Sequence, residues 1–443
     1  MKINIIRIAT ILCLATSCTQ NRATIQYEKA MLYLDSLKNT DHYAKIDEAI
    51  DLLQKSAKAG NAKAQYELGN LYWTNQDSLI PIKIDTLMAI QWYEKSADQC
   101  YAQAQYSLAY IYENTSGNLK NNQRAFDLYK AAANQGLADA LYRMGRIYQY
   151  GITDIVAKND TIALKYYQQA ADLACPAAML NLGLLYYWGG DILKADKHKT
   201  ITLFQKAAEL GYAEAQYRLG LSYMYGIEGA VSKDSTKAIK WLKLAAKNDH
   251  IKACNELGEY YLYRSGLNIN DCISMASEWY GKSVEIYHNT PGLIGLGDTY
   301  FKLFIKCNED NKIEIANIAA EVAIANYIEA DNIESRLTND IEVDNTQSQS
   351  VNYIKDDNME FKKNIILQFK SSGMDGFEFS VKKKMFIHDF ANTYYKIGLL
   401  YLYIGMSQND QKSWNVGTEW IHKAAAAGSY KAEKLIRNRY HLY

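Results

Sequence analysis

Residues able to act as acids, bases, nucleophiles or metal ligands are spread along this 443-residue chain without a catalytic arrangement. No two histidines stand four residues apart around a glutamate, as a zinc-binding helix would need; they are His42, His198, His250, His288, His388, His422 and His441. The sequence has neither a Gly-x-Ser-x-Gly elbow nor a complete Gly-x-x-x-x-Gly-Lys-Ser/Thr phosphate loop. We therefore predict a protein without catalytic residues, cofactor or metal.

Charge and composition narrow the class of partner. Lys and Arg together number 49, as do Asp and Glu, so the formal net charge is zero. A neutral chain has no long-range attraction for phosphate, which argues against a dedicated nucleic-acid binder. Hydrophobic residues make up 49% and charged residues 22%, the composition of a chain that buries a core, and this excludes wholesale disorder.

The N-terminal residues have the composition of an export signal. Lys2 and Arg7 precede an apolar run over 8–15 that is too short to span a bilayer, and small residues then lead to Cys18. The run Leu14-Ala15-Thr16-Ser17-Cys18 resembles the lipobox of bacterial lipoproteins, in which the cysteine is lipidated and becomes the mature N-terminus.

This resemblance implies a signal peptide over 1–17 and a lipidated tether over 18–24. It also implies a bacterial cell-envelope protein held on a membrane, and the lack of an acidic cluster after Cys18 favours the periplasmic side. The alternative is an ordinary cleaved signal in which Cys18 is incidental.

The remaining cysteines give no sign of a disulfide framework. Their number is odd and their spacing irregular: Cys100, Cys175, Cys254, Cys272 and Cys307. We expect most of them to be small core residues, and whether Cys254 and Cys272 pair is left open.

A pattern of alanine, leucine, glycine and tyrosine recurs along the rest of the chain. A leucine follows the alanine by four residues, a glycine comes next, and a tyrosine stands three residues after the glycine, with few replacements. The glycine position holds Gly69, Ala109, Gly145, Gly183, Gly220, Gly258, Gly297 and Gly398. The tyrosines are Tyr72, Tyr112, Tyr148, Tyr186, Tyr223, Tyr261, Tyr300 and Tyr401. The first seven copies stand 36 to 40 residues apart, which identifies an internal repeat.

A second pattern lies between these copies, as in Trp92-Tyr93-Glu94-Lys95-Ser96-Ala97. Each repeat is therefore predicted as a helix A, a loop, a helix B and a tight turn. The alanine, leucine and tyrosine of helix A fall four residues apart on one face, and stacking of neighbouring repeats completes the core. Expected helix-B caps are Asp85, Asp160, Asp234 and Asp271, and expected helix-B stops are Gly60, Gly136, Gly211 and Gly428.

These residues resemble the Sel1-like repeat family, a relative of the tetratricopeptide repeat with a longer loop. The resemblance implies an all-α, right-handed superhelical solenoid of helix-turn-helix repeats and a role in assembling protein complexes. The repeat array is placed at 25–331, an insertion at 332–386, and a final repeat with a capping helix at 387–443. The glycine-rich run 292–297 falls on helix-A positions, so it indicates tight packing and not a cofactor loop.

The insertion divides into two parts of different character. Its first part is acidic and rich in Asn, Ser and Gln, which predicts a linker. Its second part alternates apolar and polar residues over 365–370 and 377–382 around a turn sequence, which predicts a β-hairpin. It is interpreted either as an arm or flap that binds a partner or as a loop packed on its own array.

Helix A should line the concave side of such a superhelix, with its polar positions two before and one after the glycine. The residues there are Glu67, Asn70, Arg143, Arg146, Asn181, Arg218, Glu256, Glu259 and Asp298. Arginines stand in the middle repeats and acids follow toward the C-terminal side, so this groove could orient an extended partner of complementary charge. The alternative is that these are ordinary solvated helix positions.

Three functions remain open, and we favour the first. It is a non-catalytic, membrane-anchored scaffold that binds an envelope protein or peptide. The second is a glycan or nutrient binder in which Trp73, Trp188 and Trp414 stack on sugar rings. The third is a helical-toroid glycosidase, which the regular repeat argues against.

Overall fold

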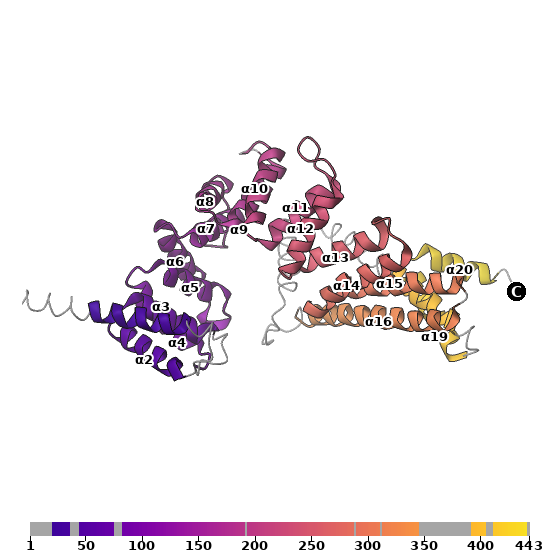
Figure 1. The fold of residues 1–443 in the computed structure, drawn as a ribbon, viewed down its shortest axis with the longest axis horizontal. Helices are drawn as coiled ribbons and strands as arrows, with labels where there is room; N and C mark the ends of the chain where they lie inside the picture. Colours follow the sequence, from indigo (N-terminus) through magenta and orange to yellow (C-terminus); the bar gives the residue numbers. More distant parts are fainter. Residues whose placement is uncertain are drawn as a thin grey trace, which may run out of the picture. The chain divides into compact units, whose positions relative to one another are not determined.

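The computed structural model describes residues 20–35, 44–74, 82–190, 193–287, 289–310, 312–344, 391–404 and 411–440. Within these ranges the fold is all-helical and contains no strand, only isolated bridges that join Ile152 to Val156 and Ile227 to Val231 inside loops (Figure 1). The all-α solenoid predicted from the sequence is confirmed. None of the described helices is both long enough and apolar enough to cross a membrane.

The chain divides into two compact units, residues 1–233 and 234–443. The first unit alternates A and B helices: a helix over 20–35 with α2 (Ala44–Lys58), α3 (Ala62–Thr74) with α4 (Thr86–Ala97), α5 (Ala102–Asn114) with α6 (Asn122–Asn134), α7 (Ala138–Tyr150) with α8 (Asp160–Asp172), α9 (Pro176–Trp188) with α10 (Lys197–Glu209), and then α11 (Ala213–Tyr225). A 3-10 turn, η1 (Gly117–Leu119), lies in the loop before α6.

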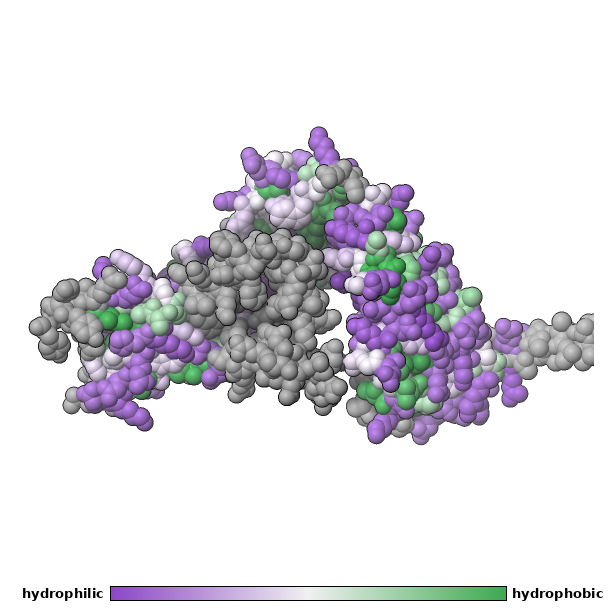
Figure 2. Space-filling model, turned by 180° about the vertical axis from the view of Figure 1, so that it is seen from behind, coloured by the Kyte–Doolittle hydropathy of each residue, from purple (hydrophilic) through white to green (hydrophobic). Residues whose placement is uncertain are grey.

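The second unit continues the alternation. It begins with the B helix α12 (Ser235–Lys247), followed by α13 (Ile251–Glu259), which continues into the π-helical turn η2 (Tyr260–Arg264). The remaining elements are α14 (Ile269–Tyr287), α15 (Thr290–Glu309), α16 (Ile313–Asp344), a helix over 391–404, α19 (Gln411–Ala426) and α20 (Tyr430–Tyr440). Hydrophilic residues cover much of the drawn face of each unit, with small hydrophobic patches between them (Figure 2).

The B helices begin at side-chain caps. Asp85 and Asp234 accept backbone N–H groups of α4 and α12, as predicted. Two predicted caps are wrong by a few residues, because Asn159 and not Asp160 caps α8, and the Asn268 side chain, not that of Asp271, accepts the first-turn N–H of α14. A cap needs extended backbone, which Asn159 has, whereas Asp160 is already helical.

Seven of the B helices end at a residue with positive φ. The predicted stops Gly60, Gly136, Gly211 and Gly428 all have this left-handed conformation. In three other repeats the same position holds a residue with a side chain: Cys100, Ala174 and Asp249, with φ of 60°, 59° and 56°. These three residues therefore carry backbone strain that glycine would relieve.

Two predicted boundaries differ from the structure. Residues 20–24 were predicted as a tether, but they belong to the helix over 20–35, in which Ala23 is 1% exposed and its carbonyl accepts the Ser56 hydroxyl of α2. The linker predicted from residue 332 overlaps α16, which stays helical to Asp344. Residues 1–17, Cys18 and the predicted hairpin at 365–370 and 377–382 lie outside the described residues.

The cysteines of the described ranges are free thiols. Cys175, Cys254, Cys272 and Cys307 are buried, as expected of small core residues, and Cys100 is exposed. Cys254 and Cys272 do not pair, and the Cys272 thiol instead lies 3.5 Å from the Ser265 hydroxyl.

Candidate partner-binding face

The glycine of each A helix fixes which side of that helix faces the core. A methyl group added at Gly69 would lie 2.6 Å from the Tyr93 ring of α4, and one at Gly145 would lie 2.6 Å from the Tyr167 ring of α8. The same contact joins Gly183 to Phe204, Gly258 to Tyr280, Gly297 to Tyr327 and Gly398 to Ile421. The glycine therefore provides the space into which the large side chain of the following B helix packs.

The opposite side of each A helix is left for solvent or a partner. A helix turns about 100° per residue, so positions two before, one after and five after the glycine share one side. We call these positions of the A helices the A-face. It contains every groove residue predicted from the sequence.

Tyrosines of the B helices reach through the repeat to polar groups beside the A-face. The Tyr93 hydroxyl donates to Asn70 Oδ1 at 2.7 Å, and the Tyr129 hydroxyl donates to Glu113 Oε2 at 2.7 Å. Burial raises the pKa of both tyrosines, so they remain protonated donors. These hydrogen bonds lock the polar residues of the A helix in place.

Arg143 lies in a network and not free in solvent. Its guanidinium is 3.7 Å from the Glu113 carboxylate, its side chain is 20% exposed, and its central carbon lies 5.5 Å from the centroid of the Tyr110 ring. Burial alone would lower its pKa, but the neighbouring Tyr129, Glu113 and Tyr106 raise it, so Arg143 keeps its charge. Arg143 therefore joins α7 to α5, the preceding A helix.

The other predicted groove residues of the first unit differ in whether they already form hydrogen bonds or ion pairs within the chain. Asn70 donates to Glu67 at 3.1 Å, and Asn181 donates to the Tyr142 hydroxyl at 3.4 Å. Arg218 pairs with Glu214 at 2.7 Å within α11. Arg146 is exposed, with its guanidinium 5.8 Å from the centroid of the Tyr150 ring. Arg146 is the cation of this set most available to a partner.

The predicted acids of the second unit mostly hold the fold. Glu259 pairs with Arg264 of η2, and Glu256 is half-buried. Asp298 accepts the hydroxyls of Tyr263 and Tyr327 and the ammonium of Lys396. This cluster fixes the helix over 391–404 to α15 and α16, so Asp298 has a structural role.

The most exposed part of the A-face was not among the groove residues predicted from the sequence. Five residues after the glycine, consecutive A helices of the first unit expose large aromatic side chains: Tyr150 at 54%, Trp188 at 76% and Tyr225 at 46%. Tyr263 holds the same position in the second unit and is 58% exposed. These aromatics could have been found in the sequence. When the repeats are aligned on their repeated tyrosine, each aromatic stands two residues after it.

The three tryptophans predicted to stack on sugars differ in their exposure to solvent. Trp188 is exposed, with its ring against Tyr187 at 4.9 Å between centroids. Trp73 and Trp414 are half-buried. Of these three tryptophans, Trp188 is therefore the one that can join Tyr150 and Tyr225 in an exposed aromatic surface on the A-face.

The repeated tyrosines lie on the other side of the A helices, where they close each repeat. The Tyr112 hydroxyl donates to Glu94 at 2.9 Å, and the Tyr148 ring stacks on Tyr166. In four repeats of the first unit the backbone carbonyl of this tyrosine also accepts an N–H from the cap of the next helix, as in Asn121 to Tyr112 at 2.9 Å and Asp196 to Tyr186 at 2.8 Å. They are residues of the fold and not of the A-face.

The described ranges contain no group of three His, Cys, Asp or Glu side chains placed to hold a metal. The glycine run at 292–297 lies inside α15, where Gly295 packs on Tyr280 and Gly297 on Tyr327. Its glycines thus serve helix packing.

Comparison with known proteins agrees with this repeat architecture. The Sel1 repeat model matches residues 26–61, 62–99, 102–137, 138–175, 176–212, 213–250, 251–285 and 391–429, which is more than half of the chain. The chain belongs to the Sel1-repeat family. The pair α15 and α16 falls outside the matched segments, yet Gly297 packs on Tyr327 there as in the matched repeats. Sel1-repeat proteins generally mediate protein–protein interactions.

Curated relatives share part of the chain. The chitin synthase regulator SKT5 of Saccharomyces cerevisiae is 28% identical over 266 residues, which cover 58% of this chain and 37% of that protein. The Sel1-repeat-containing protein YjcO of Escherichia coli is 30% identical over 207 residues, which cover 46% of this chain and 72% of YjcO. The chain thus matches little more than a third of the length of the yeast relative.

Solved structures show the same fold. A Sel1 repeat protein from Oxalobacter formigenes is 28% identical, with a TM-score of 0.51, and the match covers 58% of this chain and 99% of that one. The protective antigen c5321 of uropathogenic Escherichia coli is 22% identical, with a TM-score of 0.50, over 95% of this chain and 80% of that one. The second likeness concerns the fold alone.

Proposed function

We propose that this Sel1-repeat protein is a non-catalytic scaffold that binds an extended segment of a partner protein along the A-face of its first unit. The observation that carries the proposal is the exposure of Tyr150, Trp188 and Tyr225 at one position of three consecutive A helices. Exposed aromatics are costly in water and are the side chains that most often dominate the binding energy of protein interfaces.

The surroundings of these aromatics suit a polypeptide. Arg146 lies beside Tyr150, and Asn181 is on the same face of α9 as Trp188, so guanidinium and amide groups alternate with rings. Carbonyl and carboxylate groups of a peptide would accept from Arg146 while its apolar side chains cover the rings. The Asn181 amide nitrogen already donates two hydrogen bonds within the chain, so its carbonyl oxygen is the group that would accept a peptide N–H. Arg143 and Arg218 contribute less, because each already pairs with a glutamate.

The proposal includes an acyl anchor on Cys18 and a periplasm-facing position in a bacterial envelope. Its support is the charged start, apolar run and small residues that precede Cys18 in the sequence. Two or more acyl chains anchor a protein stably, since each buried CH₂ contributes roughly 0.8 kcal/mol. Labelled palmitate should enter the wild-type protein and not Cys18→Ala; label absent from the wild type would refute the anchor.

The A-face is tested by truncating exposed hydrophobic side chains on it and, as a control, elsewhere on the first unit. A variant with Tyr150→Ala, Trp188→Ala and Tyr225→Ala is compared with Leu173→Ala and Leu210→Ala, whose side chains are 53% and 54% exposed at the ends of B helices. Partners captured from solubilised envelopes and then purified should bind the aromatic variant at least about tenfold more weakly, a loss of about 1.4 kcal/mol. The leucine variant should bind normally.

The same pair of variants decides between the scaffold and the glycan binder. A glycan array and the purified protein partner are both probed with the wild type and the two variants. If the wild type binds only glycans, and the aromatic variant loses this binding, the protein is a glycan binder and the scaffold proposal is wrong. Equal protein binding by the aromatic and leucine variants would remove the A-face from the proposal.

A further inference from the structure

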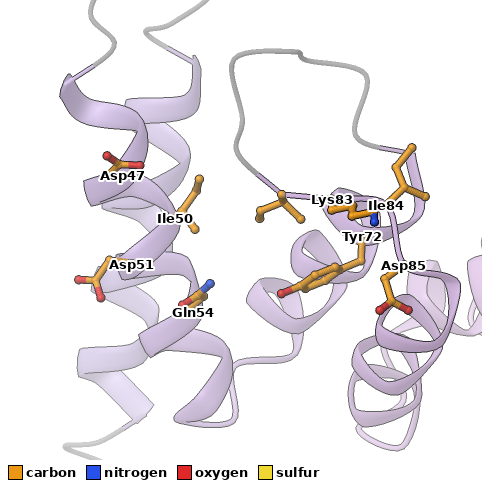
Figure 3. Close-up of a pocket in the computed structure, with 9 residues that line it drawn as sticks. Asp47, Ile50, Asp51, Gln54, Tyr72, Lys83, Ile84 and Asp85 are labelled. Atoms are coloured by element: carbon orange, nitrogen blue, oxygen red, sulfur yellow. The ribbon is translucent and has the colours of Figure 1, made fainter.

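The first unit has a pocket on the side of α3 that faces away from the A-face. It has a volume of about 590 Å³ and lies between α2 and the segment that leads into α4. Figure 3 shows the Tyr72 ring pointing toward α2 across this space, with Ile84 and Asp85 on the side of Tyr72. The lining residues are Asp47, Ile50, Asp51, Gln54, Tyr72, Ile82, Lys83, Ile84 and Asp85.

The next repeat shows what this position holds elsewhere in the chain. There the repeated tyrosine is Tyr112, and the guanidinium of Arg124 lies 5.0 Å from the centroid of its ring. The same guanidinium pairs with Glu94 at 2.8 Å, and the Tyr112 hydroxyl donates to that carboxylate at 2.9 Å. A cation, a ring and a carboxylate thus form one cluster between successive B helices.

Cations cover the repeated tyrosine in other repeats as well. The Lys199 ammonium lies 4.9 Å from the centroid of the Tyr186 ring, and the Lys243 ammonium lies 5.7 Å from that of Tyr261. Arg124 and Lys199 stand at the same place in their helices, three residues after the caps Asn121 and Asp196. In three repeats a cation thus lies against the repeated tyrosine, whereas in another the Tyr166 ring stacks on Tyr148.

At Tyr72 the chain supplies different residues. Three residues after the cap Asp85 stands Met88, which packs against the core, and the counterpart of Glu94 is Gln54. Negative charge comes instead from Asp47 and Asp51 of α2 and from Asp85.

The lining is anionic around an apolar surface. It holds three carboxylates and one ammonium, that of Lys83. Asp51 pairs with Lys55 at 2.6 Å, and one oxygen of Asp85 accepts two backbone N–H groups of α4, so these two carboxylates keep only part of their charge for a ligand. Asp47 adds a third carboxylate to the lining. Ile84, 57% exposed, and the Tyr72 ring offer walls for the stem of a long side chain.

We propose that the Tyr72 pocket receives an arginine side chain presented by a partner protein. A guanidinium can stack on the tyrosine ring and donate to carboxylates at the same time, as Arg124 does in the next repeat. This binding is independent of the A-face, because none of the lining residues belongs to it.

The probe is a fluorescein-labelled tetra-arginine peptide, with a tetra-citrulline peptide as the neutral control of the same shape. Binding to the full chain is followed by fluorescence anisotropy. The variant Asp47→Asn with Asp51→Asn is matched by Asp127→Asn with Asp172→Asn, which changes the net charge equally at exposed acids of α6 and α8. The pocket pair should weaken tetra-arginine binding about tenfold and the control pair less than twofold. Equal weakening by both pairs, or equal binding of citrulline, would overturn the proposal.

A second variant fills the pocket from within. Met88→Arg with Gln54→Glu places in this repeat the pair that Arg124 and Glu94 form in the next one. With its helical circular dichroism and melting transition retained, this variant should lose tetra-arginine binding about tenfold. Undiminished binding by the folded variant would show that the peptide binds elsewhere and would reject the pocket.

Discussion

Lys423 Nζ lies 3.0 Å from Asp331 Oδ2, so the last B helix is joined to the B helix that precedes the insertion, 92 residues earlier in the chain. The ammonium also lies 4.1 Å from the centroid of the Tyr394 ring and 4.3 Å from that of Trp420. The Tyr394 hydroxyl donates to the other oxygen of Asp331 at 2.7 Å. Together with the Asp298–Lys396 pair, this contact continues the repeat stack in the second unit despite the long insertion.

Asp331→Ala should destabilise the second unit by about 1–3 kcal/mol, because it leaves the Tyr394 hydroxyl and the Lys423 ammonium without their acceptor. The Asp331 side chain is only 14% exposed, so water replaces it poorly. Hydrogen exchange over 411–426 should accelerate. Asp51→Ala is the control, since its ion pair with Lys55 is more than half exposed and should contribute little.

Ala174→Gly should stabilise the first unit, and Gly211→Ala should destabilise it, each by about 1 kcal/mol. Both residues end a B helix with positive φ, at 59° and 86°, where a Cβ costs roughly 1–2 kcal/mol and the greater chain entropy of glycine offsets part of that. Urea unfolding measures both free energies. Changes of the same sign in the two variants would contradict the assignment of strain to Ala174.

Gly145→Ala should destabilise by about 1–2 kcal/mol. The added methyl would meet the Tyr167 ring at 2.6 Å, an overpacking cost of about 1–3 kcal/mol that better helix propensity offsets only in part. Gly281→Ala is the matched control, because no atom lies within 4 Å of its added methyl. That variant should be stabilised by about 0.5–1 kcal/mol in the same unfolding experiment.

Glu67→Gln should raise the free energy of unfolding at pH 7. Burial raises the pKa of Glu67, so the folded state holds this proton more tightly than the unfolded state, and stability is lost as pH rises through the raised pKa. Glutamine keeps an acceptor for Asn70 and does not titrate. The gain, measured by urea unfolding across pH, should disappear below the ordinary glutamate pKa of 4.5. A gain that grew toward acid pH would have the wrong sign.

Ellman's reagent should modify Cys100 much faster than the other cysteines of the described ranges. Cys100 is exposed, whereas Cys175 and Cys254 are buried, and burial raises the pKa of both thiols. Cys100→Ser should remove the fast phase at pH 8. A fast phase that persists in this variant and involves Cys175 would mean that the first unit opens readily.

Much of the fold could be predicted from the sequence because the same residues recur at the same positions in many repeats. The glycine and tyrosine columns identified the A helices, and the packing of Tyr93 on Gly69 explains why they recur. Cap identity was less predictable, since Asn159 and Asp160 are adjacent and both able to cap. The helical residues 20–24 and 332–344 were missed because polar composition there resembles that of a linker.

The candidate site was harder to predict than the fold. The sequence placed Arg143 and Asp298 on one side of the A helices, but it could not show that Glu113 and Lys396 neutralise them, since those partners come from other repeats. The exposed column of Tyr150, Trp188 and Tyr225 mixes residue types at helix ends. These exposed aromatics are hard to recognise in a tyrosine-rich sequence, because most of the other tyrosines pack within the fold.

The early start of the first helix bears on geometry at the membrane. The described residues are helical from Gln20 onward, two positions along the sequence from the cysteine proposed to carry the acyl chains. The two Cα–Cα steps from Cys18 to Gln20 span at most about 7 Å, about the depth of one lipid headgroup layer. With that anchor in place, the first repeat would lie directly on the bilayer surface. Partners would then have to approach along the plane of the membrane or carry a segment that reaches down to it.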